Sequence, residues 1–305
     1  MRDISTKHLR SLAPLAFAAL LLANGCGSGD ASSAMRDGRA AYEAGDYAAA
    51  RSHFKRLARR APENTWAAYN LGMACFKLRE YNAAAKSFER AATLADAAGT
   101  SGNDALEALA VSLRLAGKTD GALLAYDRAL EKMRREPRLL AGTAQCHIDK
   151  GQNDYGLRYL EEAFTTSEFR DPATLFNMGA LLSKPSFSAP GKTEKAAKCL
   201  YQFLSLYRND AAYADETLRA AEMLVDLSRP ADEDLRFLVY EKLVAASKAA
   251  TPRDRFRLAG EALKANPASI EALRAYVKYA RALGGVPKVE ETEEILALME
   301  RVRDR

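Results

Sequence analysis

The sequence predicts an all-α protein built from repeated helical hairpins. Two observations predict this fold: a composition rich in strong helix formers, and an internal repeat of about 34 residues. The chain has 305 residues, of which 48% are hydrophobic and 28% charged, with 10 prolines and a single tryptophan. This profile excludes collagen-like, disordered and polytopic membrane proteins. The length suits either two ordinary domains or one continuous solenoid of stacked repeats.

One recurring motif places a small and a large residue at fixed positions of a predicted helix. Its first copy reads Gly45-Asp46-Tyr47-x2-Ala50-x3-Phe54. The small residue recurs as Ala50, Ala84, Ala122, Gly156 and Ala196, in steps of 34, 38, 34 and 40 residues. The large residue recurs as Phe54, Phe88, Tyr126, Leu160 and Leu200. Because residues three to four apart lie on one face of an α-helix, the motif predicts an amphipathic helix in each repeat.

A second motif precedes the first and completes each hairpin. Ala68-Tyr69-Asn70-Leu71-Gly72 matches Leu175-Phe176-Asn177-Met178-Gly179. The small residue at the glycine position is Gly38, Ala110 and Ala144 in the other repeats. Together the two motifs resemble the tetratricopeptide repeat, a helix-turn-helix of about 34 residues. The resemblance implies a right-handed α-solenoid of helical hairpins.

The resemblance covers residues 31–210 and is weaker beyond them. We expect five repeats at 31–64, 65–98, 103–136, 137–170 and 171–210. Enlarged loops at 99–102 and 183–190 account for most of the two longer steps. Residues 211–305 are interpreted as a degenerate continuation that ends in a capping helix from about Pro287, with Ile295, Met299 and Val302 on one stripe. The alternative is a separate helical domain after about residue 229.

The N-terminus resembles the leader of a bacterial lipoprotein. Arg2, Lys7 and Arg10 precede the apolar run 11–23, which is shorter than the ~20 residues that span a bilayer as a helix. Residues 1–25 are therefore a predicted signal peptide, and residues 23–26 a loose lipobox whose Cys26 would carry the lipid. Residues 26–34 are interpreted as the lipidated cysteine and a flexible tether. Ordinary cleavage that releases a soluble periplasmic protein is the alternative.

The family usually binds a peptide or helix on a concave surface formed by the first helix of each hairpin. Carrying its positions over to this chain gives a predicted apolar groove of Met35, Tyr42, Trp66, Tyr69, Met73, Phe76 and Phe176. Aromatic side chains supply contact area at low entropic cost, and methionine adapts to varied partners. The family members that clamp a C-terminal carboxylate use Lys and Asn where this chain has Tyr69 and Met73, which disfavours that mode. Packing between helices is the alternative role for each side chain.

The charge balance gives no support for nucleic-acid binding. Without residues 1–25 the chain has 42 basic and 39 acidic residues, since the leader holds three basic residues and one acidic residue of the 45 and 40. Nucleic-acid-binding domains usually carry a strong basic excess. Basic clusters at 55–60 and 132–138 fall at the ends of predicted helices, where cations complement the helix dipole.

The sequence contains no recognisable catalytic motif, and we expect neither a metal nor a cofactor. It lacks a zinc-protease HExxH, a nucleophile elbow and a phosphate-binding glycine loop. Cys146 and His147 are adjacent, but no second pair stands at metal-ligand spacing, which favours structural packing. Apart from Cys26, the mature cysteines are Cys75, Cys146 and Cys199, all at apolar helical positions that favour buried free thiols.

These observations predict a non-catalytic scaffold for protein-protein interaction, tethered to the bacterial envelope and facing the periplasm. In the lipoproteins that the leader resembles, a residue other than Asp after the cysteine favours the outer membrane, and this chain has Gly27 there. The partners are expected to be other envelope proteins or peptides, as for assembly factors of outer-membrane β-barrels and for adaptors in pilus assembly or of cell-wall hydrolases. A hydrolase with an unrecognised site in 211–305 is the alternative from another class. The sequence leaves the partner and the oligomeric state open.

Overall fold

The computed structural model describes residues 28–229 and 233–305. Every regular element in these two ranges is a helix, which confirms the predicted all-α class. The chain divides into two compact units, with unit 1 ending at Tyr159 and unit 2 beginning at Leu160, inside helix α9 (Asn153–Thr166). Within the described ranges, no helix has the length and hydropathy needed to cross a bilayer.

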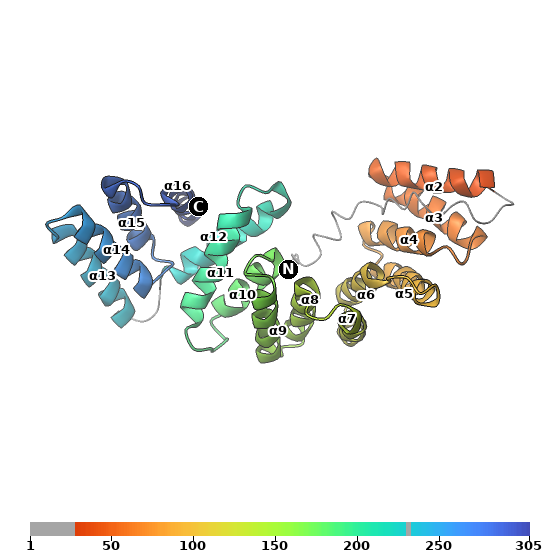
Figure 1. The fold of residues 1–305 in the computed structure, drawn as a ribbon, viewed down its shortest axis with the longest axis horizontal. Coiled ribbons are helices and arrows are strands. Elements are labelled where there is room, and N and C mark those ends of the chain that lie inside the picture. Colours follow the sequence, from red (N-terminus) through yellow and green to blue (C-terminus); the bar gives the residue numbers. More distant parts are fainter. Residues whose placement is uncertain (1–27, 230–232) are drawn as a thin grey trace. The chain divides into compact units, whose positions relative to one another are not determined.

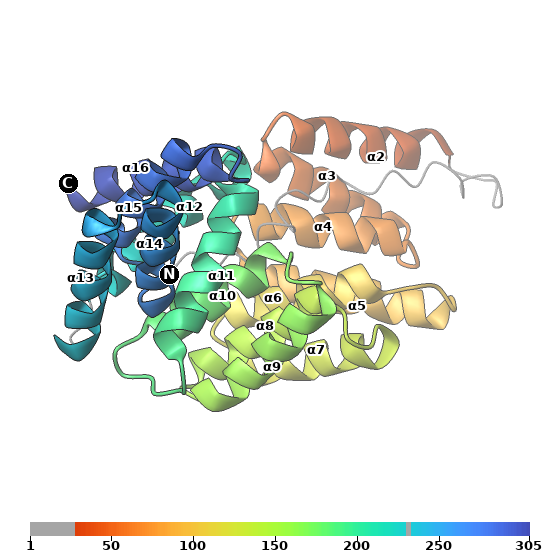
Figure 2. The same ribbon diagram turned by 60° about the vertical axis from the view of Figure 1, so that its left-hand side comes forward.

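Unit 1 is a series of helical hairpins whose members lie side by side in both ribbon views (Figures 1 and 2). Its helices before α9 are α2 (Ser28–Glu43), α3 (Tyr47–Arg60), α4 (Thr65–Lys77), α5 (Tyr81–Ala97), α6 (Asn103–Leu115), α7 (Thr119–Lys132) and α8 (Pro137–Asp149). From α2 to α8, each helix packs against the helix that follows it in the chain.

Close contact between a small and a large residue sets the spacing of the hairpins. A Cβ atom on Gly38 would lie 2.6 Å from the Phe54 ring, and one on Gly72 would lie 2.7 Å from the Phe88 ring. Real Cβ atoms do not approach other atoms this closely, so glycine is required at these positions. The two recurring motifs of the sequence therefore face each other across each of these hairpins.

The turns inside the hairpins depend on residues in the left-handed region of φ. Gly45, Gly117 and Gly151 occupy this position with φ near 80°, at values of 80, 77 and 76°. In the second hairpin, Arg79 adopts φ 61° at the equivalent place. Glycine reaches this region without a Cβ clash, whereas arginine is strained there.

Helix α2 begins within the segment that the sequence analysis predicted to be a flexible tether. Residues 28–34, expected to be flexible, are helical, and Ala34 is fully buried in a cluster with Leu57 and Ala58 of α3 and Ala67 of α4. Ser, Gly and Asp in this segment are weak helix formers, so packing of Ala34 on α3 and α4, rather than local propensity, accounts for the helix. Residues 1–27, which include the predicted leader and Cys26, lie outside the described residues.

Unit 2 contains the rest of α9 and the remaining helices. These are α10 (Pro172–Ser183), α11 (Lys192–Tyr207), the short 3-10 helix η2 (Ala211–Tyr213), α12 (Ala214–Leu227), α13 (Glu233–Lys248), α14 (Pro252–Ala265), α15 (Ile270–Leu283) and α16 (Val289–Arg303). Residues 211–305 thus belong to the same compact unit as α10 and α11.

Helix α16 does more than cap the last hairpin, because it returns to helices much earlier in the chain. It packs against α15 and also against α11 and α12. The Tyr201 hydroxyl lies 3.5 Å from Met299 Sδ, and Arg208 Nη2 lies 2.6 Å from Glu294 Oε2. Ile295 and Met299 of the predicted apolar stripe are buried, so hydrophobic packing holds α16 in this position.

We expect Phe88→Ala to lower the free energy of unfolding of unit 1 by about 3 kcal/mol or more, because the ring is fully buried. Urea unfolding followed by fluorescence of Trp66, the only tryptophan and a residue of unit 1, measures this change. Lys86→Ala, at an exposed position of the same helix, serves as the control and should shift stability by less than about 0.5 kcal/mol. A loss below about 1 kcal/mol for Phe88→Ala would contradict the packing described.

Candidate functional site

The residues of the predicted apolar groove are packed between helices. Tyr42, Tyr69, Met73, Phe76 and Phe176 are buried, with exposed fractions of 2 to 8%, while Met35 and Trp66 are partly buried. Six of the seven residues belong to unit 1, and Phe176 belongs to unit 2. The expected open apolar groove is therefore not formed by these side chains as a set.

Aromatic contacts explain this burial. The ring of Tyr69 packs edge-on against Phe88 at a centroid distance of 5.4 Å, and Trp66 packs against Phe54 at 5.5 Å. Phe176 makes the same contact with Phe203 in unit 2, at 5.5 Å. Rings spaced three to four residues apart on a first helix can thus pack on the second helix of a hairpin as well as on a ligand. A binding role for the seven residues stays a prediction.

Polar atoms gather on the first helices of unit 1 beside these rings. The Asn70 side-chain nitrogen donates to the Trp66 carbonyl at 2.9 Å, but Asn70 Oδ1 is buried without a hydrogen-bond partner among the described residues. The hydroxyls of Tyr42 and Tyr69 are likewise buried without a hydrogen-bond partner among the described residues. A buried polar atom left unpaired costs about 1–3 kcal/mol. Because these atoms are enclosed by the protein, they are closed to a polypeptide ligand in this structure.

The electrostatics of this cluster keep its tyrosines neutral. Burial raises the pKa of Tyr69 well above its usual value, and the carboxylates of Asp104 and Glu107 raise it further. Glu107 is itself buried and lies 3.7 Å from Arg138 Nη1. The Tyr69 hydroxyl is consequently a hydrogen-bond donor at any physiological pH. Its raised pKa leaves the Tyr69 hydroxyl unactivated as a nucleophile.

Unit 2 exposes an apolar surface on α13 that the sequence analysis did not single out. Phe237 is 66% exposed, Tyr240 65% and Leu238 40%. Phe237, Tyr240 and Val244 stand at positions i, i+3 and i+7, so they form a stripe along one side of the helix. The opposite side carries Val239, which packs with Ala262 of α14 and Ala272 of α15. We call Phe237, Leu238, Tyr240 and Val244 the α13 face.

A signal for the α13 face was present in the sequence. The stretch 235–244 holds apolar residues on all sides of a helix, which is more than one buried stripe can accommodate. Helix α13 lies at an edge of unit 2 in both ribbon views, so its outer side has no helix of unit 2 to pack against (Figures 1 and 2).

Cys146 and His147 lie in different environments. Cys146 is fully buried, and burial raises the pKa of its thiol to about 12. His147 stacks on the rings of Tyr155 and Tyr159 at 5.5 and 5.4 Å, and its Nδ1 lies 2.8 Å from Gln152 Oε1. Both side chains are thus engaged in packing and stacking contacts. In the part of the chain that the structure describes, no group of three or more His, Cys, Asp or Glu residues is arranged to hold a metal ion.

Comparison with known proteins identifies a repeat family in part of the chain. A tetratricopeptide repeat model matches residues 41–98. These residues are tetratricopeptide repeats, in agreement with the recurring motifs of the sequence. Proteins built from such repeats use extended concave surfaces for binding. A search of curated proteins finds no match.

Solved structures of tetratricopeptide repeat proteins share the fold at low sequence identity. MamA 41-end from Desulfovibrio magneticus RS-1 is 14% identical with a TM-score of 0.51, and the match covers 61% of this chain and 99% of that one. The MamA RS-1 ArsTM double mutant gives the same values. A tetratricopeptide repeat protein from Parabacteroides merdae ATCC 43184 is 15% identical with a TM-score of 0.49, covering 89% of this chain and 99% of that one.

The three buried thiols should be unreactive in the folded chain. Burial raises the pKa of Cys75 to about 11 and of Cys199 to about 12, as for Cys146, so all three stay protonated at pH 8. We expect the chain from residue 26 onward with Cys26→Ser to react with an aromatic disulfide reagent only after urea unfolding. Rapid reaction of a native thiol at pH 8 would contradict the burial described.

Proposed function

We propose that this protein is a non-catalytic scaffold, lipid-anchored through Cys26 to a bacterial envelope membrane, that docks other envelope proteins. The α13 face is the observation that carries the docking part of the proposal. The loose lipobox before Cys26 and the apolar run of the leader carry the anchoring part. The protein would then face the periplasm, with the outer membrane as the favoured location.

The chemistry of the α13 face suits a protein partner. Exposed aromatic side chains clustered on one turn are the residue types that dominate binding energy at interfaces. A stripe at i, i+3 and i+7 matches the way one helix presents side chains to another helix or to an apolar groove. The neighbouring Glu241 and Arg236 are exposed and give the stripe a polar rim.

The fold supports a scaffold more than an enzyme. Acid-base catalysis needs a positioned pair of titratable groups near a cleft. No observation on residues 211–229 and 233–305 favours the hydrolase alternative. The β-barrel assembly factor and the adaptor for pili or cell-wall hydrolases differ only in the partner, so capture of the partner distinguishes them.

Lipidation of Cys26 is tested by cell fractionation. We expect Cys26→Ser to move the protein from the membrane fraction to the soluble periplasmic fraction, because the variant cannot accept a lipid. Ser28→Ala provides a nearby control that keeps the thiol. Unchanged membrane association of the Cys26→Ser variant would contradict the proposed lipid anchor.

Docking through the α13 face is tested by crosslinking in cells. A photoreactive residue at Tyr240 should capture a discrete envelope protein, whereas one at Glu89, exposed on α5 of unit 1, should not. Phe237→Ser should reduce capture from Tyr240 at least about tenfold, the loss typical of a central aromatic contact. Equal capture from both positions, or no capture from Tyr240, would refute docking at this face.

A further inference from the structure

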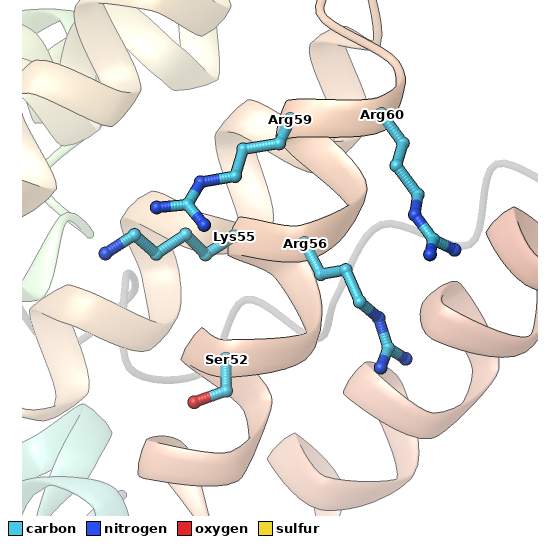
Figure 3. A pocket seen from close by; sticks show the side chains of 5 residues that line it. All are labelled: Ser52, Lys55, Arg56, Arg59 and Arg60. Atoms are coloured by element: carbon cyan, nitrogen blue, oxygen red, sulfur yellow. The ribbon is translucent and has the colours of Figure 1, made fainter.

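Helix α3 of unit 1 presents a strongly cationic face. Ser52, Lys55, Arg56, Arg59 and Arg60 line a shallow depression on its surface. Their spacing of three and four residues places them along one side of the helix, and all five are exposed. Figure 3 shows Lys55 and Arg59 extending to one side of this surface and Arg56 and Arg60 to the other. We call these five residues the α3 cationic face.

The helix dipole accounts for only half of these charges. Cations in the last turn complement the dipole, and Arg59 and Arg60 lie in the last turn of α3. Lys55 and Arg56 lie further inside, where the dipole has little effect. Helix α3 itself contains no acidic residue that could balance them.

Several other cations of unit 1 pair with carboxylates, in contrast to part of this face. Arg51, also on α3, pairs with Glu80, Arg128 lies 3.0 Å from Glu89, and Lys150 lies 2.6 Å from Asp120. Lys55 and Arg59, in contrast, form no ion pair within the described ranges. The Arg56 guanidinium approaches His53 Nδ1 at 3.4 Å, not a carboxylate. Lys55, Arg56 and Arg59 therefore place like charges side by side, an arrangement that an anionic partner would stabilise.

The α3 cationic face lies at the end of unit 1 where the chain begins. Helices α2 and α3 form an antiparallel hairpin, and Ala34 near the start of α2 packs on Leu57 and Ala58 near the end of α3 (Figure 2). Cys26 stands two residues before Ser28, the first residue of α2, a separation of at most about 7 Å along the chain. A lipid on Cys26 would thus hold this end of unit 1 at the membrane surface.

We propose that the α3 cationic face binds the anionic headgroups of the membrane to which Cys26 anchors the protein. This inference rests on the proposed lipid anchor. Clustered Lys and Arg residues near a membrane are attracted by anionic lipids, and a second contact beside a lipid restricts how the anchored unit is oriented. The occupant is the headgroup layer, because its negative charge complements the α3 cationic face. The short segment between Cys26 and α2 keeps this end of unit 1 close to that layer.

The test uses the chain from residue 26 onward with Cys26→Ser, so that no lipid contributes to binding. We expect it to bind phosphatidylcholine vesicles only when they contain phosphatidylglycerol. In the triple variant K55E/R56E/R59E, the partition coefficient between these vesicles and water should fall at least about tenfold. The matched variant R236E/R253E/K278E changes three exposed cations of unit 2 and alters the net charge equally. The partition coefficient of this control should stay within about twofold of that of the parent chain, because its three cations lie on the separate helices α13, α14 and α15 and form no cluster.

Several outcomes would overturn the proposal. Equal losses in the two triple variants would show that only net charge matters, and absence of binding to phosphatidylglycerol would exclude a headgroup site. A photoreactive residue at Lys55 that captures an acidic protein in cells would assign the face to a protein partner. Helical circular dichroism and Trp66 fluorescence verify folding, and K55Q/R56Q/R59Q replaces the charge reversal if it disturbs the fold. Fractionation of Cys26→Ser tests the anchor separately, so the two proposals can fail independently.

Discussion

The close approach of a glycine to an aromatic ring inside a hairpin is the contact on which the rest of the structure depends. Gly72 allows the Phe88 ring to lie against the backbone of α4, and Gly38 does the same for Phe54. With the two helices this close, their remaining side chains must pack on the next hairpin, which extends the core from one repeat to the next. The outer sides of helices such as α3 and α13 are left to carry charge or apolar surface.

This dependence explains what the sequence could predict. The small residue and the large residue stand at fixed distances along the chain, whether the pair is Gly72 with Phe88 or Ala110 with Tyr126, so the hairpins of unit 1 follow from local spacing alone. Spacing alone could not decide whether the predicted groove residues are exposed or buried. The position of Tyr69 in its helix is compatible with contact to a ligand and with contact to the Phe88 ring. Only packing in three dimensions separates these roles. The helical start at Ser28 was missed for a related reason, since Ala34 is held by residues from α3 and α4.

The surfaces singled out on the two units have opposite chemistry. The α3 cationic face suits a fixed, negatively charged layer, which needs no shape complementarity. The α13 face suits a partner with a defined shape, because aromatic anchors act through fitted contacts. Under the two proposals, attachment and recognition would lie on separate units of one chain. The protein is nearly neutral overall and yet has a strongly basic face on α3. This is possible because acidic residues elsewhere pair with other cations, as Glu89 does with Arg128 and Asp120 with Lys150.

The return of α16 to α11 gives the two units different folding requirements. Contacts in unit 1 join helices that follow one another closely, and such local contacts form quickly. Unit 2 is held by pairs such as Arg208 with Glu294, which lie 86 residues apart. Unit 1 can therefore fold while the chain is still emerging, whereas unit 2 must wait for its last helix. Until then, the surfaces of α11 and α12 that α16 covers stay exposed to chaperones and proteases.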